Sequence, residues 1–239
     1  MKTPNLFLLL LAAASLSGCA MKPVRVAATP EYAAREPIAT SLFPSDQAVL
    51  GDEAISRILS SKLELPAKAK LALMRFPGER SWRYYWRDDE LAKLQQGHVD
   101  ALTTNLLASD QIAEVTPLPS LMTPRQASIP LLREAAVRMQ ADLLLVFRVG
   151  ADTYSQSRTF AKDKVKAYST CEVVLLDVRT GLVPFTRVIS RERSELKQSG
   201  DLDLDEATRR AEQGASAEAL SAAAQELVSF IKAVPRKGQ

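Results

Sequence analysis

Leu143-Leu144-Leu145-Val146-Phe147 is the most apolar run in the chain after its N-terminal apolar stretch. A run without polar interruption is typical of a central strand that is covered on both faces, because neither face then meets water. The expected strand continues beyond this run, through Val149 toward Tyr154. The run therefore predicts a sheet with helices on its faces.

Further strands are expected on both sides of this run in the sequence. The segments at residues 70–76, 112–118, 165–178 and 182–196 have the composition of strands. Pro117 lacks a backbone N–H, which places its segment near an edge of the sheet. Between the last two segments, Asp177-Val178-Arg179-Thr180-Gly181 predicts a turn in which Gly181 supplies a positive φ.

Helical spacing of apolar residues marks the segments between and after these strands. We expect helices at residues 46–59, 88–108, 129–140 and 201–234, with Gly214 as a point at which the last region divides into two helices. The apolar faces are Ile55, Ile58 and Leu59 in the first helix, Leu91, Leu94, His98, Leu102 and Leu106 in the second, Leu131, Leu132, Ala135 and Met139 in the third, and Leu220, Ala224, Leu227, Phe230 and Ile231 in the last.

This order of elements predicts the fold class. Helix, strand, helix, strand, helix, three strands and a final helix fit an α/β (α+β) fold. We expect a single mixed β-sheet of about five strands covered by helices, with the C-terminal helix packed on the sheet.

The N-terminus has the layout of a secretory signal. Lys2 gives a positive start, and the apolar stretch at residues 6–14 is shorter than the roughly 20 residues of a membrane span. Leu16-Ser17-Gly18-Cys19 then resembles a bacterial lipobox. The resemblance implies cleavage before Cys19, a diacylglyceryl thioether on its sulfur and N-acylation of the new terminus, for example with palmitate. An ordinary secretion signal with an incidental cysteine is the alternative.

The residues that follow Cys19 predict a tethered organisation. Ala20 in place of aspartate resembles an outer-membrane address, so we expect the protein in the outer membrane, facing the periplasm. Residues 20–46 are rich in proline and alanine and show no strand or helix period, which is typical of a semi-extended tether. The expected organisation is a signal peptide at 1–18, the acylated cysteine and tether at 19–46, and a single periplasmic domain at 47–239.

Three segments of this domain resemble a known group of proteins. The strand at residues 70–76, then Ala141-Asp142-Leu143-Leu144-Leu145-Val146, and the strand and turn at residues 173–181 are similar to the periplasmic domain shared by the curli-secretion lipoprotein, the penicillin-binding-protein activator lipoprotein and the amino-terminal domain of the Tol translocation protein. The similarity spans about residues 45–234. It implies a role in docking, activation or export without catalysis in this domain. Pore formation is disfavoured, since there is no pair of long alternating segments of about ten residues.

One aromatic segment is the candidate partner surface. Trp82, Arg83, Tyr84, Tyr85, Trp86 and Arg87 are unusual in a chain with 6% aromatic residues. Aromatic residues and arginine dominate binding hot spots. Two interpretations stay open: the segment closes the core beside the strand at residues 70–76, or it forms the surface that binds a partner.

The sequence carries no recognised catalytic or cofactor-binding pattern. His98 is the single histidine and lies on the apolar face of its predicted helix, so we expect it to be packed. We expect no metal site and no cofactor, because clustered ligands and phosphate-binding loops are missing. Cys171 has no intrachain partner if Cys19 is acylated, and its apolar surroundings favour a buried free thiol over a reactive one.

These observations predict a non-enzymatic envelope lipoprotein. The net charge of +3 comes from mixed signs, which does not indicate a nucleic-acid partner. The arginines near residues 187–193 are interleaved with glutamates, as on a solvated strand face. We expect an adaptor domain that is anchored to the membrane through Cys19 and binds another envelope protein. A homo-oligomeric component of an assembly or export system, and a hydrolase of cell-wall or lipid material, are the alternatives.

Overall fold

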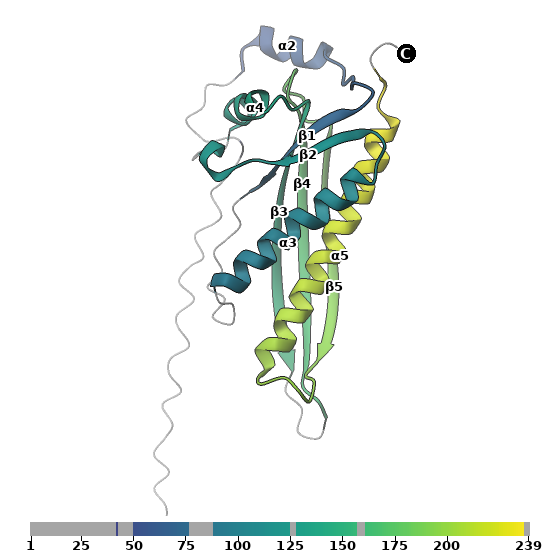
Figure 1. The fold of residues 1–239 in the computed structure, drawn as a ribbon. Coiled ribbons are helices and arrows are strands. Elements are labelled where there is room, and N and C mark those ends of the chain that lie inside the picture. Colours follow the sequence, from purple (N-terminus) through teal and green to yellow (C-terminus); the bar gives the residue numbers. More distant parts are fainter. Residues whose placement is uncertain (1–41, 43–49, 77–87, 125–127, 157–160, 237–239) are drawn as a thin grey trace, which may run out of the picture. The chain divides into compact units, whose positions relative to one another are not determined.

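A five-stranded mixed sheet forms the centre of the fold (Figure 1). The computed structural model describes residues 42, 50–76, 88–124, 128–156 and 161–236, which belong to one compact unit. The strands are β1 (Ala69–Arg75), β2 (Ile112–Pro117), β3 (Leu143–Gln156), β4 (Lys164–Asp177) and β5 (Phe185–Leu196). Their order in the sheet is β2-β1-β3-β4-β5. The predicted sheet is confirmed.

Two kinds of pairing meet in this sheet. β1 pairs in parallel with β2 and with β3, while β3, β4 and β5 form an antiparallel meander. β3 is the middle strand, and its residues 143–147 are all buried, as their apolar run predicts. β2, which ends at Pro117, lies at one edge of the sheet as expected.

Helices cover the two faces of the sheet unequally. The described helices are α2 (Asp52–Ser60), α3 (Asp88–Leu107), α4 (Ile129–Arg138) and α5 (Leu204–Ala233), with a 3-10 turn η2 at Ser120–Met122. α3 and α5 lie together on one face (Figure 1). α4 packs on the other face, beside the end of the sheet at which β3 begins. None of the described helices combines the length and the apolar character that crossing a bilayer requires.

Each face has its own hydrophobic core, because successive side chains of a strand point to opposite faces. The larger core lies under α3 and α5 and includes Leu71, Leu145, Phe147, Leu106 and Leu227. The smaller core lies under α4. It is formed by Ala72, Met74, Phe76, Leu132, Ala136, Leu144, Val146, Leu176 and Val178. α5 therefore packs on the sheet, as predicted.

α5 is one continuous helix, so the predicted division at Gly214 is wrong. Asp203 caps its first turn, since the Asp203 carboxylate accepts a hydrogen bond from the Glu206 backbone N–H at 3.1 Å. Ala211 and Ala215, on either side of Gly214, are both buried against Val165 and Ala167 of β4. Burial of one alanine stripe on both sides of the glycine offsets the helical cost of glycine, which is about 1 kcal/mol.

Two helices differ in detail from the expectation, while the state of Cys171 agrees with it. The first helix begins at Asp52, not Asp46, and residues 46–49 lie outside the described part. None of its residues is buried. In α4 the buried residues are Leu132, Ala135 and Ala136, whereas Leu131 is exposed, because the side of the helix that meets the sheet lies one position further along. Cys171 is a buried free thiol, as expected.

Candidate functional site

The two sites predicted from the sequence lie outside the described residues. These are Cys19, the predicted acylation site, and the aromatic segment at residues 82–87. Both stay predictions. A third candidate, which the sequence did not single out, lies on the sheet itself.

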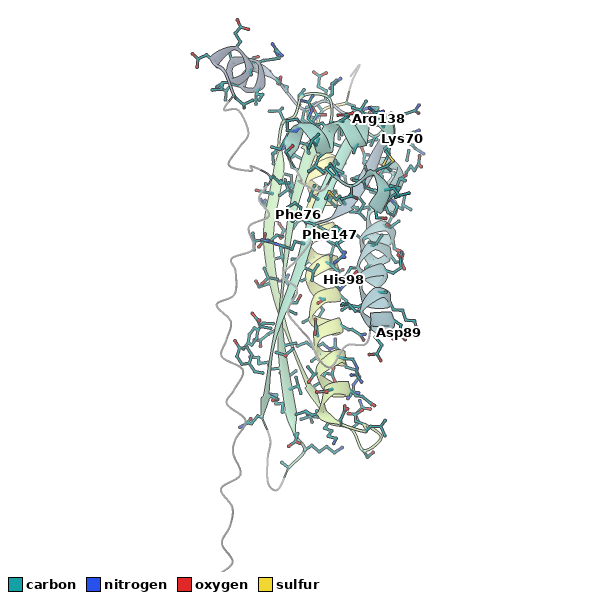
Figure 2. The ribbon with its side chains drawn as sticks, turned by 90° about the vertical axis from the view of Figure 1, so that its left-hand side faces the viewer. Lys70, Phe76, Asp89, His98, Arg138 and Phe147 are labelled. Carbon is teal, nitrogen blue, oxygen red and sulfur yellow. The ribbon has the colours of Figure 1, made fainter. Side chains whose placement is uncertain are left out.

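The antiparallel half of the sheet has one face that no described helix covers. α4 covers the beginning of β3, but beyond Val146 the face turned away from α5 carries polar and aromatic side chains (Figure 2). We call it the open sheet face. It is formed by Arg148, Tyr154, Lys166, Tyr168, Thr170, Glu172, Val188, Ser190 and Glu192. The set shares one face because each strand contributes every second residue.

An aromatic pair with a charged neighbour lies toward the far end of the open sheet face. The rings of Tyr154 and Tyr168 meet edge to face, with centroids 5.8 Å apart. Lys166 Nζ lies 4.8 Å from the Tyr168 ring centroid and 2.7 Å from Glu192 Oε2. The hydrogen bond to Glu192, and next the one to Tyr168, raise the pKa of Lys166, and the same contact with Lys166 lowers the pKa of Glu192. Both groups are therefore charged at neutral pH.

Paired polar groups occupy the middle of the same face. Arg148 Nη2 lies 2.5 Å from Glu172 Oε2, and the hydroxyls of Thr170 and Ser190 are 3.0 Å apart. Val188, opposite Glu172 on the edge strand β5, is 69% exposed. The face therefore presents apolar surface among side chains that are already held by their neighbours.

A small pocket lies at the border between the open sheet face and the part of the same face that α4 covers. It has a volume of about 180 Å³, and its lining includes Leu42, Phe76, Val146, Val174 and the Arg148–Glu172 ion pair. Phe76 follows β1, and its backbone N–H donates to the Phe147 carbonyl at 2.7 Å, which fixes the end of β1 beside β3 (Figure 2). The pocket thus joins an apolar wall to a charged rim.

A second hollow lies between β5 and α5. It has a volume of about 400 Å³ and is lined by Phe185, Arg187, Gln225, Glu226, Ser229 and Phe230. Arg187 Nε donates to Glu226 Oε2 at 2.7 Å, so the charges across this hollow satisfy each other. Arg193 likewise pairs with Glu218. Arg191 donates to the Ser190 carbonyl instead, so two of the three arginines of β5 are exposed and ion-paired.

His98 belongs to α3 and lies on the side of the sheet that α3 and α5 cover. Its Nε2 is buried without a hydrogen-bond partner in the described part of the chain. Burial, and secondarily the positive charge of Arg75, lower the pKa of His98 to about 4. Arg75 is held by a 2.9 Å hydrogen bond from its Nη2 to Gln95 Oε1. The imidazole is therefore neutral at pH 7 and packed in the helix–sheet interface, which agrees with its position in the sequence pattern.

The described residues offer little to a metal ion. Within them no three histidine, cysteine, aspartate or glutamate side chains are grouped so that they could hold one. Burial raises the pKa of the Cys171 thiol to about 12, with a smaller effect of Glu172. Cys171 is therefore a protonated thiol in the core and a poor nucleophile.

Comparisons with known proteins give only distant likenesses. No protein-family model matches the chain, and no curated protein is significantly similar to it. Among solved structures it is similar to rare lipoprotein B from Shewanella oneidensis, with 12% identity over 68% of this chain and 93% of the other and a TM-score of 0.34. It is also similar to a minor lipoprotein from Acinetobacter baumannii, with 12% identity over 68% and 94% and a TM-score of 0.36.

A third solved structure is the PelC dodecamer from Paraburkholderia phytofirmans. Its identity with this chain is 16% over 68% of this chain and 93% of the other, with a TM-score of 0.33. The chain is thus similar in structure to bacterial envelope lipoproteins at low identity.

Proposed function

We propose that this chain is an outer-membrane lipoprotein whose periplasmic unit is a non-enzymatic adaptor for another envelope protein, and that the open sheet face is its binding surface. The observation that carries the proposal is the exposed Tyr154–Tyr168 pair within a face of prearranged polar partners. The lipobox at residues 16–19 supports the anchor.

The open sheet face has the composition of a binding surface. Tyrosine offers a large, rigid area and one polar group, and few of its rotations are lost on binding. Tyr154 is 64% exposed and Tyr168 is 40% exposed, so a partner gains by covering them. Ion pairs such as Lys166–Glu192 hold their side chains in place before a partner arrives, which lowers the entropy cost of association.

The route of the chain supports the same surface. Leu42 packs against the smaller core and lines the pocket at the border of the open sheet face. The tether predicted from the sequence, at residues 20–46, could span tens of ångströms at about 3 Å per residue. That reach lets a unit anchored at Cys19 meet a partner that is embedded in, or close to, the same membrane.

Photo-crosslinking in intact cells tests the proposal. A photoreactive amino acid at Tyr154 or Val188 should trap one specific envelope protein, while the same amino acid at Lys93, on the exposed side of α3, should not. Mass spectrometry of the N-terminal peptide should show diacylglycerol and an acyl chain on Cys19. Capture of the same proteins from all three positions, or of none, would count against the binding surface.

The two alternatives give different results in the same cells. A homo-oligomeric assembly would yield crosslinks between copies of this chain from Tyr154 or Val188. A histidine-dependent hydrolase would lose its cellular phenotype in His98→Ala, whereas an adaptor that binds through the open sheet face would keep it.

A further inference from the structure

α2 exposes an apolar side although it is a well-formed helix. Leu59 is 81% exposed and Ile55 is 40% exposed, and Leu50, two residues before the helix, is 55% exposed. Ile55 and Leu59 are four residues apart and therefore lie on one side of the helix, as does Asp52 in its first turn, while Glu53, Arg57 and Ser60 lie on the other. Ala54 and Ile58 are only partly covered. The rest of the unit therefore covers only part of the apolar side of α2.

The chain is tied to the rest of the unit a few residues after α2. The hydroxyls of Ser60 and Ser61 donate to the Arg57 carbonyl at 3.0 and 2.7 Å, which closes the last turn. Directly after α2 the chain is tied to the unit, because the Leu65 N–H donates to the Pro235 carbonyl at 3.2 Å and Arg179 Nη2 donates to the Glu64 carbonyl at 3.1 Å. Figure 1 shows α2 at the end of the sheet where β3 begins.

A helix of this length gains from having its apolar side covered. α2 has nine residues, none of them buried. Helices shorter than about 12 residues are marginal in water unless packing stabilises them. The three exposed side chains fall well short of the roughly 800 Å² that each partner buries in a stable protein–protein interface. A second protein is therefore a poor match for this surface alone.

A lipid surface is a better match for the exposed apolar side of α2, because the chain that precedes α2 leads to the predicted lipid anchor. Residues 20–41 lead back to Cys19, whose predicted acyl chains lie in the membrane. The tether keeps α2 within tens of ångströms of the bilayer, so its effective concentration there is high and a few apolar side chains suffice for docking. Asp52 and Glu53 balance Arg57 and Lys62, so the contact does not depend on anionic lipid.

We propose that α2 lies in the membrane interface, with Leu50, Ile55 and Leu59 inserted among the phospholipid acyl chains, and forms a second contact beside the lipid anchor. This inference rests on the proposed acylation of Cys19. The contact orients the unit: the end of the sheet next to α2 faces the bilayer, and the β3–β4–β5 strands extend away from it, which leaves the open sheet face free for a partner.

Depth-dependent fluorescence quenching tests this contact. The full acylated protein is placed in vesicles of phosphatidylethanolamine with a minor share of phosphatidylglycerol, and an environment-sensitive dye is attached to Leu59→Cys. Leu202→Cys, 90% exposed just before α5, is the matched control. Cys171 is buried and Cys19 is acylated in this protein, so the dye marks only the introduced thiol. Brominated phospholipid should quench most of the emission at position 59 and none at position 202.

The possible outcomes separate this inference from the proposed function. Equal, aqueous emission at both positions in protein whose acylation is verified by mass spectrometry overturns the α2 contact and leaves the adaptor proposal standing. A blue-shifted emission at position 59 that appears only at high protein concentration and is not quenched by brominated phospholipid would show a protein–protein interface. This outcome also overturns the α2 contact. An unacylated mature protein overturns both proposals.

Discussion

Gly214 of α5 lies directly against the side chain of Arg193 in β5. A methyl group at position 214 would overlap with Cδ and Nε of Arg193. Arg193 in turn donates to Glu195 and Glu218, each at 2.9 Å. The glycine therefore leaves room for an arginine that links the edge strand to the long helix.

A double-mutant cycle on this pair has a defined expectation. Gly214→Ala gains about 1 kcal/mol from helix propensity in an Arg193→Ala background. With Arg193 present, this gain should be smaller, because the arginine side chain must move away and give up its ion pairs with Glu195 and Glu218. Urea unfolding of the four proteins measures the difference. The same stabilisation in both backgrounds would show that the close approach has no energetic consequence.

Gly181 gives a second comparison, in the turn between β4 and β5. Its φ is +82°, and an added methyl group would lie 3.1 Å from Arg133 Nη1. Gly181→Ala should lower the free energy of unfolding by about 1–2 kcal/mol, since side chains disfavour this backbone region. Gly150→Ala in β3 is the matched control, because nothing lies within 4 Å of its added methyl group. That control should be neutral or stabilising by up to about 1 kcal/mol.

The sequence predicts the strands of this fold better than the ends and faces of its helices. The apolar run at residues 143–147 predicts a central strand because burial on both faces needs unbroken apolar character. The continuity of α5 across Gly214 depends on β4, which lies far away in the sequence. Local propensity could not reveal it.

The sequence does not single out the open sheet face, for a related reason. Tyr154, Tyr168 and Val188 are spread over three strands, and none of them stands out in its own segment. The antiparallel register brings them onto one face, since Asp152 pairs with Tyr168 and Tyr168 pairs with Glu192. Every second residue along each of the three strands belongs to the open sheet face, but the set can be assembled only when the register between the strands is known. The aromatic segment at residues 82–87, in contrast, stands out in the sequence because its residues are contiguous.

Removal of the exposed tyrosine separates binding from stability. Tyr154→Ala should change the free energy of unfolding by no more than about 1.5 kcal/mol, the value of one aromatic pair. If Tyr154 is a hot spot, the same change weakens partner binding by about 2 kcal/mol, or roughly thirtyfold. Leu202→Ala, exposed on another loop, is the control. Titration of the crosslinked partner against each variant measures the effect, and equal affinity for both variants would remove Tyr154 from the surface.

His98 makes the stability of the unit depend on pH in a defined direction. Its folded-state pKa of about 4 lies below the ordinary value of 6.5, so the native state favours the neutral imidazole. The unfolded chain then binds the proton more readily, and stability is fully present above about pH 6.5 and is lost as the pH falls toward 4. The loss at the acid end is up to about 3 kcal/mol.

Because the chain has one histidine, NMR titration of its imidazole protons reports this pKa directly. His98→Gln removes the titrating group, so its unfolding free energy should fall less between pH 6.5 and pH 5, above the range in which carboxylates titrate. A histidine that titrates near 6.5, or a variant with the same slope as the wild type, would show that the imidazole is solvated and not packed between α3 and the sheet.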